Sequence, residues 1–236
     1  MMMAGLLFMA SCSSNDPAPN GTVALKMEAT SSTGSTINGR KLTATVITDF
    51  KVSIREIKFE FDELDAHYKT DSTYDDDAKL MGPFVVDILE PNGFVEQVVT
   101  TVNLPNAQYE EVEFIFHKNT DAGDMNGKSI YIAGTIDGKP FVFWHDTSEA
   151  FEIDFENPTT DLVINGNSAA PVITFNLEQL FSAIKGGVNL GLAVDGDLDG
   201  TIEINPGSSD NDGNKDLSDA IKNLLMTSVD LMEDKD

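Results

Sequence analysis

The chain has 236 residues, of which 41% are hydrophobic, enough for the core of one substantial domain with or without an appendage. It carries 40 acidic and 15 basic side chains, and its formal net charge is −25. This charge argues against nucleic acid as a partner, because affinity for nucleic acid depends on Lys and Arg neutralising phosphates. The single cysteine excludes a disulfide framework and a thiolate metal site.

That cysteine, Cys12, lies directly after a short apolar run and two small residues, and a polar Ser/Asn/Pro stretch follows it. The arrangement resembles the lipobox of bacterial lipoproteins, in which the cysteine is acylated and becomes the mature N-terminus. We expect residues 1–11 to be a truncated signal peptide, because a leader normally carries Lys or Arg. Residues 12–21 would form the lipidated tether. The resemblance implies a lipid-anchored protein of the bacterial outer membrane or cell surface; the alternative is a buried thiol behind an ordinary leader.

The middle of the chain predicts short antiparallel strands, because apolar and polar residues alternate between turn-forming residues. The alternation slips by one residue at Arg55-Glu56, which predicts a β-bulge that keeps the apolar side chains on one face. Asp137-Gly138 predicts a two-residue type I′ hairpin. The expected strands cover residues 22–29, 42–47, 51–61, 109–117, 129–136, 140–144, 151–155, 162–164 and 172–177.

Two further segments complete the predicted domain. Residues 84–89 are almost continuously apolar, which favours a strand buried on both faces. Residues 177–184 favour one or two helical turns. Strands at this spacing indicate a sandwich or barrel instead of βαβ units. The predicted fold class is therefore all-β, an antiparallel β-sandwich over residues 22–190, followed by a C-terminal segment, 191–236.

A run of residues 84–89 followed by Leu104-Pro105-Asn106-Ala107-Gln108-Tyr109, leading into an alternating strand, resembles the domain-of-unknown-function family 4382. The similarity covers residues 22–180. It implies a β-rich fold and a place among secreted bacterial lipoproteins. Since that family has no established activity, the resemblance implies no catalytic residue.

The C-terminal segment contains the spacing of a calcium loop. Oxygen-bearing side chains occupy alternate positions, and Gly200 stands where a calcium loop turns sharply. The expected ligands are Asp195, Asp197, Asp199, Glu203 and the carbonyl of Thr201. Pro206 stands where an EF-hand has its bidentate glutamate, so either another ligand comes from the next segment or the site is a weaker variant.

That next segment repeats the spacing imperfectly, and we expect one of its carboxylates to complete a Ca²⁺ shell. The candidates are Asp210, Asp212, Asp216 and Asp219. The alternative is that a very acidic chain forms Asp-Gly turns without any ion. Residues 216–232 have apolar side chains at three- and four-residue steps, which predicts one amphipathic helix docked on its own sandwich; the alternative is a helix that binds a partner.

Nothing in the sequence nominates an enzyme. The three histidines lack ligand spacing, and no nucleophile elbow, P-loop or dinucleotide fingerprint occurs. We expect a non-enzymatic binding or structural module of the cell envelope, stabilised by calcium, with a glycan or surface protein as partner. The alternative is a carbohydrate-binding surface lipoprotein, for which Trp144, Tyr131, Tyr68 and Tyr74 are the candidate aromatics. A third is an adhesin-like subunit, whose sign would be an unpaired edge strand.

Overall fold

The computed structural model describes residues 20–30, 45–63, 77–90, 93–94, 96–155, 161–181, 186–207, 211–226 and 229–233. The strands are β1 (Asn20–Thr30), β2 (Thr45–Phe61), β3 (Ala78–Asp87), β4 (Leu89–Glu90), β5 (Gly93–Phe94), β6 (Gln97–Pro105), β7 (Gln108–Phe116), β8 (Ile130–Ile136), β9 (Lys139–His145), β10 (Ala150–Asp154), β11 (Leu162–Val163), β12 (Ser168–Ala169), β13 (Pro171–Asn176), β14 (Ile202–Ile204) and β15 (Val229–Glu233). The helices are α1 (Leu177–Phe181), a 3₁₀ turn η3 (Leu190–Leu192) and α2 (Lys215–Leu225).

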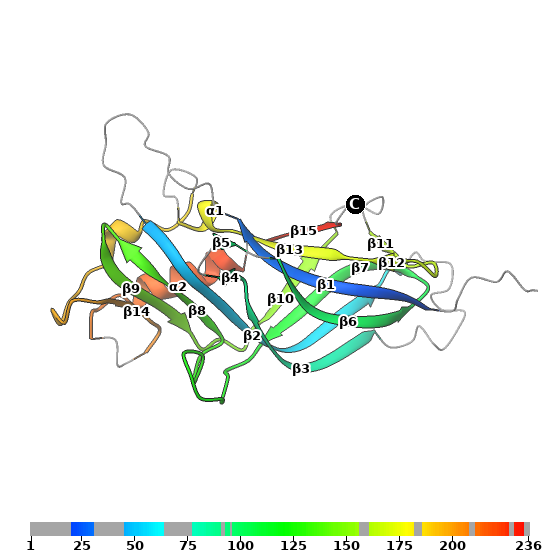
Figure 1. The fold of residues 1–236 in the computed structure, drawn as a ribbon, viewed down its shortest axis with the longest axis horizontal. Helices are drawn as coiled ribbons and strands as arrows, with labels where there is room; N and C mark the ends of the chain where they lie inside the picture. Colours follow the sequence, from blue (N-terminus) through cyan, green and yellow to red (C-terminus); the bar gives the residue numbers. More distant parts are fainter. Residues whose placement is uncertain are drawn as a thin grey trace, which may run out of the picture.

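Two sheets form a sandwich (Figure 1), which confirms the predicted all-β class. The larger sheet runs β10-β7-β2-β8-β9-β14, with β3 beside β2 and β11 beside β7. The smaller sheet runs β12-β1-β13-β15, with β6 beside β1. Pairing is mostly antiparallel, but β1 pairs in parallel with β12 and β13, and β14 pairs in parallel with β9. The C-terminal segment therefore adds a strand to each sheet.

The core lies between the sheets and consists of the inward residues of each alternating strand. Phe50 of the larger sheet meets Phe175 of the smaller one edge to face, with ring centroids 5.3 Å apart. The buried Tyr109 satisfies its hydroxyl by donating to the Pro105 carbonyl at 2.9 Å. These contacts fix the two sheets face to face.

The predicted bulge and hairpin are both present. The register of β2 shifts between Ile54 and Glu56 against both β3 and β7, and Val52 and Phe59 on either side of the shift are fully buried. Asp137 and Gly138 have φ values of 51° and 82°, the left-handed pair that a type I′ turn requires. The one extra residue at the bulge keeps the apolar set on the core face, as expected.

Residues 84–89 differ from the prediction, because they are not buried on both faces. They belong to β3 and β4, and β3 is an edge strand on which Val85 is 48% exposed. The continuous apolar run therefore lies largely in an edge strand, and the side chains on the outer face of that strand are exposed to solvent. Pro83 in the same strand fits an edge position, where a missing N–H removes no ladder bond.

The predicted helix over residues 216–232 is too long. Helix α2 ends at Leu225, and residues 229–233 form β15, antiparallel to β13. Val229 and Leu231 flank the polar Asp230, so this segment also has the start of a strand period, and the free side of β13 supplies the ladder hydrogen bonds. The prediction that α2 docks in cis is confirmed, since Ile221 and Leu225 are buried in the main core.

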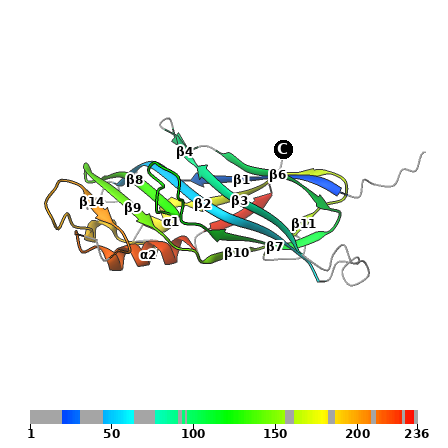
Figure 2. The same ribbon diagram turned by 90° about the horizontal axis from the view of Figure 1, so that it is seen from below.

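Figure 2 shows α2 lying along the sandwich below β8 and β9, close to β14. The expected turns over residues 177–184 are present as α1. The predicted tether, with Cys12, and the acidic stretch 64–76 lie outside the described residues apart from Asn20 and Gly21, which begin β1.

Candidate metal centre

The predicted calcium loop lies between η3 and β14, and its own backbone turns the carboxylates inward. Gly200 donates its N–H to Asp195 Oδ2 at 3.2 Å, and Asp199 donates to Asp197 Oδ1 at 3.1 Å. Leu198 and Gly200 have φ values of 65° and 101°. Both left-handed residues tighten the loop, and glycine is needed at the second because few side chains tolerate that conformation.

Asp212, fifteen positions after Asp197, reaches the loop from the segment before α2. Its side chain is buried, with the residue 4% exposed. Oδ1 accepts from the N–H groups of Gly196 and Asp197 at 2.8 and 3.3 Å, and Oδ2 accepts from the N–H of Glu203 at 2.6 Å. A Cβ at Gly196 would lie 2.6 Å from the Asp212 carbonyl oxygen, so this close approach requires glycine.

The result is two overlapping groups of carboxylates whose candidate ligand oxygens lie within 4.8 Å of one another. One group is Asp195, Asp197 and Asp212, and the other is Asp197, Asp199 and Glu203. Burial raises the pKa of Glu203 to about 7, and its hydrogen bond with Asp212 and the charge of Asp199 act in the same direction. The site is therefore short of positive charge.

Lys139 of β9 supplies part of that charge. Its ammonium lies 2.7 Å from Asp195 Oδ2, and this contact holds the pKa of Asp195 below its ordinary value. The other oxygen, Asp195 Oδ1, is buried without a hydrogen-bond partner, and the whole Asp195 side chain is only 5% exposed. A buried carboxylate oxygen with no donor is costly, and a bound cation is one partner that would satisfy it.

Asn214 fastens the loop to helix α2. Its side-chain amide donates to the carbonyls of Val194 and Glu203, both at 2.8 Å, and its Oδ1 accepts from the Val194 N–H at 3.1 Å. Asn214 is the residue directly before the helix. A ligand that orders the loop therefore acts on the start of α2 as well.

Of the remaining predicted ligands, only Thr201 lies in the loop among the described residues. Thr201 lies within the loop and donates its N–H to Asp199 Oδ1 at 2.8 Å. Asp219 contacts Lys215 at 2.6 Å and lies 3.8 Å from His145 Nε2, and Asp216 is in the exposed first turn of α2. Among the described residues, neither Asp216 nor Asp219 is part of a cluster of neighbouring carboxylates. Asp210 lies outside them.

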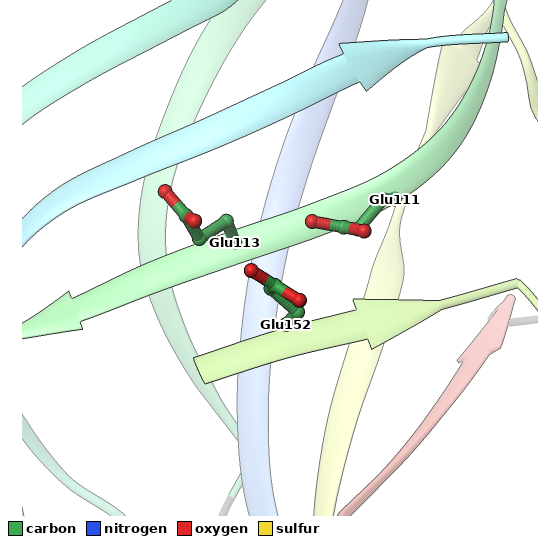
Figure 3. A group of neighbouring side chains, drawn as sticks. All are labelled: Glu111, Glu113 and Glu152. Atoms are coloured by element: carbon green, nitrogen blue, oxygen red, sulfur yellow. The ribbon is translucent and has the colours of Figure 1, made fainter. Parts of the chain in front are cut away.

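A second acidic group, which sequence analysis did not find, lies on the outer face of the larger sheet (Figure 3). Glu111 and Glu113 project from β7 beside Glu152 of β10, and burial together with Glu152 raises the pKa of Glu111 to about 7. Lys58 lies 3.9 Å from Glu113 and compensates part of the charge. The spacing of Glu111 and Glu113 places them on one face, but only the register with β10 brings Glu152 to them.

The candidate aromatics are partly brought together. Tyr131 and Trp144 are direct cross-strand neighbours on β8 and β9, and both are half-buried. The ammonium groups of Lys128 and Lys51 lie 5.1 and 5.6 Å from the centre of the Tyr131 ring. A sugar would have to displace a lysine ammonium group to stack on the Tyr131 ring. Tyr68 and Tyr74 lie outside the described residues.

A comparison of the chain with protein-family models, with curated proteins and with solved structures found no match. The resemblance to the domain-of-unknown-function family 4382 stays a prediction. Among the described helices, none has the length and apolar character needed to cross a membrane.

Proposed function

We propose that the protein is a non-enzymatic, lipid-anchored module of the bacterial cell envelope whose C-terminal segment is stabilised by Ca²⁺. The observation that carries the calcium part is Asp195 Oδ1, a buried oxygen without a partner beside the carboxylates of Asp197 and Asp212. The anchoring part rests on the sequence around Cys12.

The donor set favours calcium over other common metals. Every candidate ligand is a carboxylate or carbonyl oxygen, which suits a hard cation, and zinc would favour thiolate or imidazole ligands. Pro206 has no side-chain oxygen to act as a ligand at its position in the loop. Asp212, which belongs to the next segment, offers a carboxylate beside Asp195 and Asp197 instead. An irregular oxygen cage built from a loop and a neighbouring segment is better matched to Ca²⁺ than to Mg²⁺, which demands near-ideal octahedral geometry.

The expected role of the ion is to hold the tail to the sandwich. The loop leads into β14, which pairs with β9, and Asn214 ties it to α2. Extracellular sites with Kd of about 10⁻⁴–10⁻³ M are about nine-tenths to half occupied at 1 mM calcium. At ten times Kd, binding adds about 1.4 kcal/mol to the free energy of unfolding.

Calorimetric titration with CaCl₂ and thermal unfolding with calcium or EDTA test this proposal. Asp197→Asn should weaken binding and remove the shift in Tm, because Asp197 belongs to both carboxylate groups. Glu152→Gln, in the other acidic cluster, is the matched control and should leave the calcium response unchanged. If chelation and Asp197→Asn both leave stability and hydrogen exchange over residues 195–226 unchanged, the loop is an ordinary acidic turn.

The alternative function is glycan capture, and the observation in its favour is the cross-strand pair of Tyr131 and Trp144. A glycan array separates the two functions. Saturable binding that Trp144→Ala abolishes, with no response to calcium, would favour the carbohydrate-binding module.

A further inference from the structure

Along one side of the sandwich, the edge of one sheet lies beside the edge of the other, and no described strand joins them. Strand β3 pairs only with β2, and β6 only with β1, among the described residues. Figures 1 and 2 show β3 and β6 side by side although they belong to different sheets. A groove of about 320 Å³ lies between them, lined by Phe84–Asp87 from β3 and Gln97–Val99 from β6.

The core is incompletely covered at this groove. Two apolar side chains that line the groove, Phe84 and Val99, pack against the core but stay only half-buried. Val85 and Val98 also line the groove, and they are 48% and 57% exposed. Apolar residues in such a concentration on two facing edges mark a binding surface more often than isolated exposed residues do.

The edge of β3 also offers backbone groups. Ile88 donates its N–H to the Phe50 carbonyl of β2 at 3.0 Å. Because backbone groups alternate along an antiparallel strand, Val86 also faces β2, and the N–H and C=O of Val85 point away from it, toward the groove. On β6, the pairing with β1 shifts next to Val98, and a bulge of this kind leaves an extra residue without a ladder partner.

We infer that this groove accepts an extended segment of a partner protein, which adds a strand beside β3 with apolar side chains at every second position and basic residues between them. Backbone bonds to Val85 would give affinity, and the alternate apolar side chains would cover Phe84 and Val99. The charge of the chain selects a basic strand. A net charge of −25 attracts Lys and Arg and makes a second copy of the same chain repulsive.

The probe is a synthetic peptide of about ten residues in which valine alternates with lysine and threonine, a length typical of a strand. We expect saturable binding by calorimetry that weakens with salt, and slower hydrogen exchange over residues 84–87 and 97–99. The same peptide N-methylated at alternate residues cannot form the ladder and should not bind. A peptide with aspartate in place of lysine should bind at least about tenfold more weakly.

Val85→Pro tests the site on the protein, because proline removes an N–H that points away from β2. We expect about a tenfold loss of peptide affinity. Val163→Pro is the matched control. Since Ile164 donates to the Ala107 carbonyl at 2.9 Å, the N–H of Val163 likewise points away from its neighbour, at a different edge.

Three results would overturn the inference. The first is equal binding of the N-methylated peptide to the unaltered protein, a test that needs no variant to fold. The second is equal affinity of Val85→Pro and Val163→Pro for the parent peptide. The third is concentration-dependent dimerisation in sedimentation experiments that Val85→Pro abolishes, which would make a second copy the occupant.

Discussion

Replacing Asp212 with alanine should destabilise the protein even when calcium is absent, because its carboxylate accepts three backbone N–H bonds. Two are short, from Gly196 at 2.8 Å and Glu203 at 2.6 Å, and the third, from Asp197, is longer at 3.3 Å. A hydrogen bond to a charged acceptor contributes about 1.5–3 kcal/mol. Counting the two short bonds, and allowing water to reach part of the freed amides, we expect a loss of about 3–4 kcal/mol.

Urea unfolding in EDTA, followed by circular dichroism, measures this loss. Asp212→Asn keeps one acceptor oxygen and should lose about half as much. Asp216→Ala is the control, because Asp216 lies in the exposed first turn of α2 and contributes only about 0.5 kcal/mol through the helix dipole. A loss below about 1 kcal/mol for Asp212→Ala in EDTA would refute the view that this carboxylate holds the loop together.

Three other predictions concern charge and the anchor. Since the pKa values of Glu203 and Glu111 are raised to about 7, ionising either side chain lowers the stability of the protein as pH rises from about 4.5 through 7. In EDTA, Glu203→Gln and Glu111→Gln should therefore both stabilise the protein at pH 8. Only Glu203→Gln should weaken calcium binding measured by calorimetry. Burial lowers the pKa of His145, so the stability that its neutral form contributes is present above pH 6.5 and is lost as pH falls below 6.5. The difference in urea midpoint between the parent protein and His145→Gln should therefore change between pH 7.5 and 5. A constant difference would contradict this. Cys12→Ala should leave an unprocessed or soluble protein, and unchanged membrane partitioning would show that Cys12 is not the anchor.

Local features of the fold could be predicted because each depends on a few neighbouring residues. The bulge at Arg55-Glu56 follows from a slip in alternation, and the hairpin at Asp137-Gly138 follows from the conformations that these two residues tolerate. The change from helix to strand after α2 could not, because residues 229–233 suit both periods and the free side of β13 decides between them.

The candidate metal centre likewise has one part that local spacing predicts and another part that it does not. The spacing of Asp195, Asp197 and Asp199 is local and indicates a loop with converging carboxylates. That Asp212, and not Asp216 or Asp219, joins them depends on how the segment before α2 packs against the loop, which no spacing rule contains. The cluster of Glu111, Glu113 and Glu152 depends on strand register in the same sense.

The parallel pairing of β1 with β13 has a consequence for the order of folding. The Thr174 hydroxyl donates to the Glu28 carboxylate across 146 residues of chain, and Glu28 lies directly opposite Thr174 in the ladder. Until residues 168–176 have been synthesised, β6 is the only described strand with which β1 can pair. The pairing of β1, the first strand, is therefore completed only after β13 has been made, and contacts between residues so far apart in the sequence slow folding. In a chain that is interrupted before β12 and β13, one edge of β1 stays without its partner strands, and an exposed strand edge is an aggregation hazard.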